Sequence, residues 1–245
     1  DESDGSFVHI PPTYSIVTNI DREHMDFYKT IDDLKKNFSE FINKIPSFGK
    51  SFICIDDKIN KELIKSIKSK NYYTYGKNIK SNFLIKNIIQ KREMTQFDLI
   101  VNLPNKKKQI IKSIKIPLIG IHNIRNSVAA AAVALTVGIT INDIKDGLLK
   151  FNGVQRRFNK IFSLNGVDFY DDYAHHPTEI KMTLDGVKKV YKDYEKVCVF
   201  QPHRISRLRD LRKDFSFSFQ DADVVILCPV YSAGEKIKLG FSYFK

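Results

Sequence analysis

The sequence predicts an α/β fold made of two successive domains. Short apolar runs alternate with longer amphipathic segments over residues 14–75, and a similar alternation returns over residues 167–227. Because strand–helix–strand crossovers place neighbouring strands parallel, both stretches predict mostly parallel sheets. The pattern changes near residue 151, so we expect one domain over residues 1–150 and a second over residues 151–245.

In the first domain, strands are expected over residues 14–19, 51–55 and 72–75, with helices between them. Thr30 is a plausible N-cap for the first helix, and the second is expected over residues 56–69. Residues 82–116 form short isoleucine-rich runs around a lysine-rich tip at 106–108, which predicts an antiparallel excursion. Two further helices are expected over 123–137 and 141–149.

The second domain opens with two predicted strands, over 159–164 and 167–172. They are joined by Asn165-Gly166, which suits a type I′ hairpin turn. Pro177 stands where the first residue of a helix reaching about residue 194 is expected. A strand over 197–200, a helix over about 206–219 and a strand over 224–227 complete the pattern.

The composition narrows the class of protein. The net charge is +12, but the basic residues are spread along the chain without aromatic platforms, which favours a solvated surface over nucleic-acid binding. The longest apolar run, over 128–135, is shorter than the roughly 18 to 20 residues of a membrane span. Cys54, Cys198 and Cys228 are far apart and odd in number, which indicates reduced thiols in a cytoplasmic protein.

Polar side chains gather after two predicted strands of the second domain. One strand runs into His175, His176 and Pro177, and the other into His203 and Arg204, with Arg207 and Arg209 just inside the next helix. Carboxyl ends of parallel strands share one edge, and helix N-termini and guanidinium groups both favour anionic oxygens there. We therefore expect a site for phosphates or carboxylates. The alternative is that His176 only caps its helix and that Arg207 and Arg209 are surface residues.

Two acidic residues and one histidine remain as candidates. Strand alternation places Asp171 and Asp172 on opposite faces, and Asp172 is the better candidate for binding a ribose hydroxyl or a metal. His24 is either a metal ligand or a solvated loop histidine. Gly49-Lys50-Ser51 is not a complete phosphate-binding loop, because Lys44 stands where that motif requires glycine.

Several short motifs follow one another along nearly the whole chain. They are 1–7 (DESDGSF), 16–20 (IVTNI) with 24–26 (HMD), 120–123 (GIHN) with Asn126, 153–158 (GVQRRF), 171–179 (DDYAHHPTE), 200–204 (FQPHR) and 231–235 (YSAGE). Together they resemble the Mur ligases of bacterial peptidoglycan synthesis. The resemblance implies that residues 1–150 are the C-terminal portion of a central ATP-binding domain, and that residues 151–245 are an incomplete, Rossmann-like C-terminal domain. We accordingly expect the chain to be a piece of a longer protein.

The resemblance also implies a reaction. It is the ATP-dependent ligation of L-alanine to the carboxylate of UDP-N-acetylmuramate through an acyl phosphate, with Mg²⁺ as cofactor, in the bacterial cytoplasm. Neither a nucleic-acid partner nor membrane insertion is expected. The oligomeric state is left open.

By the same likeness, individual residues acquire expected roles. His24 would be a metal ligand; His122, Asn123 and Asn126 would flank the adenine; Asp172 would hold the ribose; Arg157 would reach the phosphates; and Tyr173, His175, His203, Arg204 and Arg207 would surround the amino acid and the reacting carboxyl. Of these, His175 and Arg157 would act in catalysis.

Two other functions compete with this one. A related recycling ligase joins an intact tripeptide to the same UDP-sugar, although Phe158 and His203-Arg204 favour the alanine branch. Alternatively, the chain is an inactive basic fragment that binds anionic polymers, with an affinity that falls steeply as salt rises.

Overall fold

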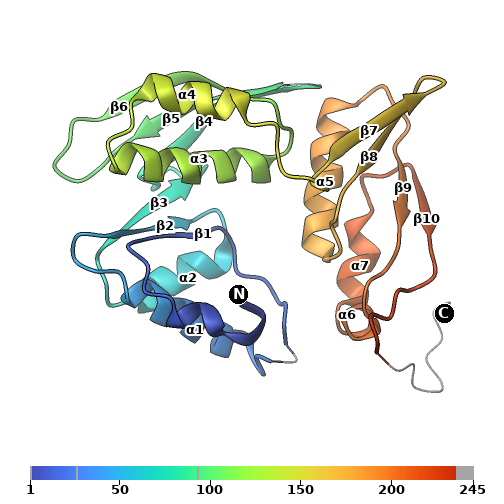
Figure 1. The fold of residues 1–245 in the computed structure, drawn as a ribbon, viewed down its shortest axis with the longest axis horizontal. Helices are drawn as coiled ribbons and strands as arrows, with labels where there is room; N and C mark the ends of the chain where they lie inside the picture. The colour runs from blue at the N-terminus through green and yellow to red at the C-terminus, as the bar shows by residue number, and fades with distance from the viewer. Residues whose placement is uncertain (1, 26, 93, 236–245) are drawn as a thin grey trace. The chain divides into compact units, whose positions relative to one another are not determined.

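A computed structural model describes residues 2–25, 27–92 and 94–235 (Figure 1). The chain divides into two compact units. The first comprises Asp1–Ile89, Met94–Pro117 and Asn123–Phe151, and the second comprises Gln90–Glu93, Leu118–His122 and Asn152–Lys245. The α/β fold predicted from the sequence is confirmed.

The sheet of the first unit has, among the described residues, six strands that neighbour one another in chain order. They are β1 (Tyr14–Val17), β2 (Lys50–Cys54), β3 (Tyr72–Gly76), β4 (Phe83–Lys91), β5 (Met94–Val101) and β6 (Gln109–Ile116). The strands from β1 to β4 pair in parallel, whereas β5 and β6 pair antiparallel. The predicted antiparallel excursion is therefore confirmed.

The helices that accompany this sheet are α1 (Ile31–Asn43), α2 (Lys58–Ser66), α3 (Ile121–Thr136) and α4 (Ile141–Lys150). In Figure 1, α1 and α2 lie together beside β1 and β2, and α3 and α4 lie beside β4–β6. Thr30 caps α1 as predicted: its Oγ1 accepts from the Asp33 N–H at 3.1 Å, and the Asp33 carboxylate accepts from the Thr30 N–H at 3.0 Å. Val17, Ile42 and Leu63 are buried in the core between β1, α1 and α2.

In the second unit, β7 (Asn159–Leu164) and β8 (Val167–Asp171) form an antiparallel hairpin, and β9 (Val197–Phe200) pairs in parallel with β10 (Val224–Leu227). Asn165 and Gly166 have φ values of 49° and 81°, so both adopt the left-handed backbone that the type I′ turn requires. The helices are α5 (Pro177–Val190), α6 (Ile205–Asp210) and α7 (Arg212–Ser218). The core contains Ile180 and Leu184 of α5 together with Phe200 and Phe215.

Three predicted helices differ in extent from the structure. The helix expected to reach about residue 194 ends at Val190. The helix expected over 56–69 spans only α2, because the N–H groups of Lys68 and Ser69 both donate to Asn43 Oδ1 at 3.0 Å. The single helix expected over 206–219 is divided into α6 and α7 at Leu211, whose φ is −112° and ψ is 22°. Leu211 is buried and packs in the same apolar cluster as Phe215, so the residue at the break is part of the core.

None of the helices in the described part of the chain has the length and apolar character needed to span a bilayer.

Candidate functional site

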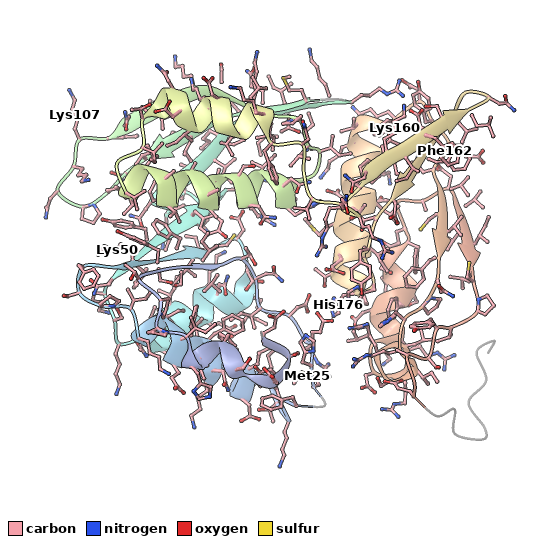
Figure 2. The ribbon with its side chains drawn as sticks, in the orientation of Figure 1. Met25, Lys50, Lys107, Lys160, Phe162 and His176 are labelled. Carbon is pink, nitrogen blue, oxygen red and sulfur yellow. The ribbon has the colours of Figure 1, made fainter. Side chains whose placement is uncertain are left out.

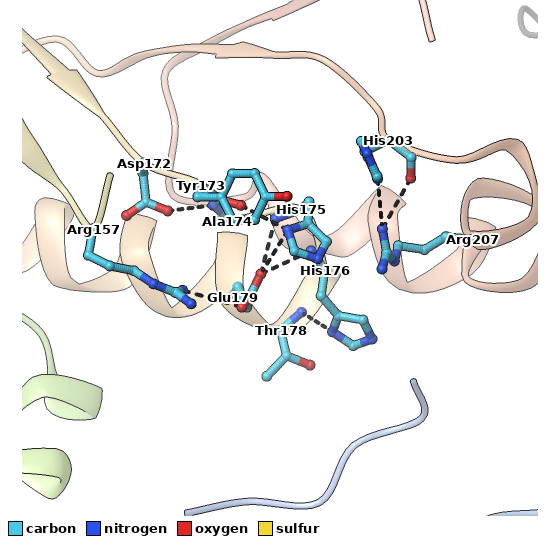
Figure 3. Close-up of polar contacts among 10 residues, drawn as sticks. All are labelled: Arg157, Asp172, Tyr173, Ala174, His175, His176, Thr178, Glu179, His203 and Arg207. Carbon is cyan, nitrogen blue, oxygen red and sulfur yellow. Dashed lines mark hydrogen bonds and ion pairs between the residues drawn. The ribbon is translucent and has the colours of Figure 1, made fainter. Parts of the chain in front are cut away.

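The loops after β8 and β9 lie side by side in the second unit (Figure 3). The ring centroid of His175 is 5.0 Å from that of Tyr173 and 5.9 Å from that of His203. Arg207 Nη1 lies 3.4 Å from His203 Nδ1 and donates to the His203 carbonyl at 3.3 Å. On the same loop, Arg204 has a φ of 68°, and its N–H donates to the Tyr231 carbonyl at 2.9 Å. The structure thus gathers the residues expected around the amino acid into one cluster.

Glu179 organises the start of α5, next to His176, which is labelled in Figure 2. Its Oε2 accepts from the N–H groups of His175 at 3.1 Å and His176 at 3.3 Å, and its Oε1 is 3.4 Å from Arg157 Nη1. His176 Nδ1 in turn accepts from the Thr178 N–H at 3.3 Å, which completes a reciprocal capping box. The interpretation of His176 as a helix cap is therefore confirmed, and it is buried in that role.

The neighbouring carboxylates Asp171 and Asp172 have different surroundings. Asp171 Oδ2 pairs with Arg156 Nε at 3.2 Å on the exposed side of the hairpin. Asp172 Oδ1 accepts from the Ala174 N–H at 2.7 Å, in a part-buried position. This contrast agrees with the alternation expected for the end of a strand, while the ribose contact of Asp172 stays a prediction.

Burial and charge shift two pKa values in this cluster. Burial, followed by the positive charge of Arg207 and the neighbouring His175 and Arg204, lowers the pKa of His203 below its ordinary 6.5, so its imidazole is neutral at pH 7. Burial raises the pKa of the Asp172 carboxyl, against the opposing N–H groups of Ala174 and Phe158. A neutral imidazole beside guanidinium groups suits a site that holds an anion and handles a proton.

A pocket of about 260 Å³ lies at the carboxyl end of β1 in the first unit. His24 lines it together with the acidic residues Glu2, Asp21 and Glu23. The His24 backbone has a φ of 58°, and its carbonyl accepts from the Tyr28 N–H at 2.9 Å, so a tight turn presents this residue.

The side chains around this pocket limit how it could hold Mg²⁺. Among the described residues, no group of three or more His, Cys, Asp or Glu side chains is arranged to hold a metal ion. Mg²⁺ is usually held by only one or two protein groups and completes its shell with waters and phosphate oxygens. The carboxylates that line the pocket beside His24 therefore fit a magnesium–nucleotide complex, in which the protein supplies only part of the ion's shell.

The residues expected near adenine lie on the first turns of α3. Asn123 is half-buried, Asn126 is exposed, and the intervening Arg125 donates from Nε to Asp56 at 2.9 Å. Gly120 precedes the helix with a φ of 90°, and a Cβ there would lie 2.6 Å from the ring of His122. Only glycine lets the His122 ring fold back over the chain at this point.

Sequence reasoning assigned no role to three carboxylates that the structure shows to be central. Glu179 could have been found from its position three residues after the N-cap, which is the capping-box spacing. Glu235 accepts from the Ser206 N–H at 2.9 Å and from Ser206 Oγ at 2.6 Å, and Asp56 binds Arg125. No local pattern indicates these two contacts, because each joins segments far apart in sequence.

Two family models match the chain. The Mur ligase middle domain matches residues 2–134, and the Mur ligase glutamate ligase domain matches residues 156–240. The chain belongs to the Mur ligase family. The two matches include the motifs that carry the sequence resemblance, except for residue 1 and residues 153–155.

Individual Mur ligases match the chain over nearly its whole length. The UDP-N-acetylmuramate–L-alanine ligase of Pelagibacter ubique is 69% identical over 99% of the chain and 52% of the relative. The crystal structure of a UDP-N-acetylmuramate-alanine ligase from Thermotoga maritima has a TM-score of 0.74 and 25% identity, covering 96% of the chain and 50% of its own. A MurF ligase from the same organism, in complex with ADP, shares the fold at 17% identity with a TM-score of 0.68, covering 89% of the chain and 48% of its own. The chain spans about half the length of the curated relatives it matches.

Proposed function

We propose that this Mur ligase chain is part of an enzyme that joins L-alanine to the carboxylate of UDP-N-acetylmuramate at the expense of ATP, in the bacterial cytoplasm. The observation that carries the proposal is the cluster of His175, His203 and Arg207, which combines a neutral imidazole with a guanidinium group. The 69% identity to a relative bearing that activity supports the choice of amino acid.

The reaction proceeds in two steps. A carboxylate oxygen of the UDP-sugar attacks the γ-phosphorus of ATP, which releases ADP and leaves an acyl phosphate. The amine of L-alanine then attacks the acyl carbon, phosphate departs, and the amine loses a proton. Mg²⁺, when bound, would neutralise phosphate charge, and His24 is the residue of this chain that would contact it.

The second unit supplies the groups for the amine. Arg204 and Arg207 would hold the carboxylate of L-alanine by charge-assisted hydrogen bonds. His175 Nδ1 lies 2.9 Å from the Tyr173 carbonyl, which can only accept, so the neutral ring carries its proton on Nδ1. Nε2 is then the basic atom that would take the proton from the amine. Arg157 would stabilise the phosphates, and Asp172 would hold the ribose of ATP.

The domain assignment is part of the proposal. We assign residues 1–150 to the central ATP-binding domain, with His122, Asn123 and Asn126 at the adenine, and residues 151–245 to an incomplete C-terminal domain. The parallel pair β9–β10 supports the second assignment: Val199 is 65% exposed and Leu227 is 59% exposed, which is unusual for the apolar strands of a finished domain.

The test is phosphate release by the longer protein that contains this chain, supplied with ATP, Mg²⁺ and UDP-N-acetylmuramate. L-alanine, the tripeptide and no acceptor are compared. Release that depends on L-alanine supports the proposal, and dependence on the tripeptide assigns the chain to the recycling branch. If no acceptor stimulates phosphate release, the proposed ligase function is wrong.

A further inference from the structure

Asp56 lies just beyond β2 and holds together three segments of the first unit. Its carboxylate accepts from the Lys77 N–H at 2.8 and 3.0 Å, from the Asn78 N–H at 3.0 Å and from Arg125 Nε at 2.9 Å. The side chain is only 8% exposed. Both carboxylate oxygens are therefore engaged by donors from the loop after β3 and from α3.

Gly76 permits this arrangement. Its φ is 138°, and a Cβ there would lie 2.7 Å from Asp56 Cγ and Oδ1. Any other residue at position 76 would displace the carboxylate, so the loop after β3 closes on Asp56 only because position 76 lacks a side chain.

Arg125 connects this carboxylate to the helix that carries the adenine residues. It stands two residues after Asn123 and one before Asn126, on the first turns of α3. Successive residues of an α-helix are rotated by about 100°, so fixing the direction of Arg125 fixes the directions of its neighbours. Buried ion pairs contribute little net stability, because the cost of desolvation offsets their attraction. Their best-documented effect is to favour one arrangement of the segments that they join over the alternatives.

We propose that Asp56 is a positioning residue for nucleotide binding. By holding Arg125 and the loop at residues 76–78, it sets the rotation of α3 at which Asn123 and Asn126 meet the adenine. This inference rests on the proposed function, because the adenine contacts belong to it.

The experiment compares variants of the longer protein by direct titration with ATP and by steady-state kinetics. Asp56→Asn removes the negative charge that binds Arg125. Arg125→Met removes the guanidinium but keeps the backbone N–H groups that donate to the Asp56 carboxylate. Each should raise the Kd for ATP about tenfold, because Asn123 and Asn126 would then meet the adenine from a shifted direction. The KM values for L-alanine and UDP-N-acetylmuramate should stay within about twofold, since the ion pair acts on the adenine residues alone.

Asp98→Asn is the matched control. The Asp98 carboxylate also accepts from a backbone N–H, that of Ser113 at 2.8 Å, and from a side chain, Asn87 Nδ2 at 2.7 Å. It joins β4, β5 and β6 and does not contact α3 through these bonds, so the Kd for ATP should be unchanged.

The outcomes separate this inference from the function on which it rests. If Asp56→Asn fails to fold, Arg125→Met decides. A lowered melting temperature with unchanged ATP affinity in Arg125→Met would show a merely structural ion pair and overturn the inference. If the unsubstituted protein neither binds ATP nor ligates L-alanine, the proposed function fails and this inference fails with it.

Discussion

The two units present polar groups at their strand ends in opposite ways. In the first unit the central ion pair, Asp56 with Arg125, is largely withdrawn from solvent, and the carboxylate is satisfied by the protein itself. In the second unit His175, His203 and Arg207 are half-buried, and backbone groups help to orient them. One edge therefore uses its charges to hold segments of the protein together, whereas the other leaves charged groups accessible to solvent.

This difference matches the chemistry that each edge would serve. Adenine is an uncharged ring, and in the proposed function its recognition would depend on the orientation of amide groups such as those of Asn123 and Asn126. A carboxylate or an acyl phosphate carries negative charge, and its recognition depends on nearby cations such as Arg207. Substitutions in the cluster of histidines and arginines in the second unit should accordingly affect the amino acid, and substitutions in the first unit the nucleotide and its metal.

The largest effect is expected at Arg207. Arg207→Ala should raise the KM for L-alanine about 100-fold, because it removes a charge-assisted contact to the substrate carboxylate. The KM for ATP should change less than about twofold, since no nucleotide contact is lost. Arg209→Ala is the control: its Nε donates to Asp210 at 2.9 Å on the exposed side of the same helix. Equal changes in the KM values for L-alanine and ATP would show that Arg207 does not act specifically on the amino acid.

His24 gives the corresponding test in the first unit. His24→Ala should raise the Mg²⁺ concentration needed for half-maximal phosphate release about tenfold, because one protein contact to the ion is lost. His9→Ala substitutes an exposed histidine of the same unit and should leave the Mg²⁺ requirement unchanged. An unaltered Mg²⁺ dependence in His24→Ala would show that His24 is a solvated loop histidine and not a metal ligand.

Asp172 tests whether the second unit also contacts the nucleotide. Asp172→Asn should raise the KM for ATP about fivefold, because an ionised carboxylate accepts hydrogen bonds from ribose hydroxyls more strongly than an amide does. UDP-N-acetylmuramate binding should be nearly intact. Asp171→Asn, one residue earlier and paired with Arg156, is the control. A matching loss of ATP affinity in both variants would show that the effect is not specific to Asp172.

Local signals predicted most of the fold. The N-cap at Thr30, the turn at Asn165-Gly166 and the helix start at Pro177 are all set by the residues at those positions, and each is confirmed. The break at Leu211 was not predicted, because it depends on how Leu211 and Phe215 enter a core formed by distant segments.

For the candidate site, too, local signals were sufficient for some residues, whereas others depend on contacts between distant segments. Residue type was enough to nominate His175, His203 and Arg207, which the structure brings together. It could not decide between cap and ligand for His176, nor could it find Asp56, whose carboxylate binds a residue 69 positions away. Their assignment depends on which distant groups meet in the folded chain.

The smallest expected effect concerns the protonation of His203. Because the folded pKa lies below the ordinary value of about 6.5, the unfolded chain binds more protons at this position, and the ring costs stability as the pH falls below that value. The cost is absent above pH 7, and it stops growing once the pH passes below the folded pKa. Histidine NMR titration, with His203→Gln to assign the signal, should show a midpoint below 6.5. Arg207→Gln should move that midpoint upward, because it removes the largest of the charge repulsions on the ring. A midpoint that stays in place would mean that burial and the other neighbouring groups depress the pKa without a contribution from Arg207.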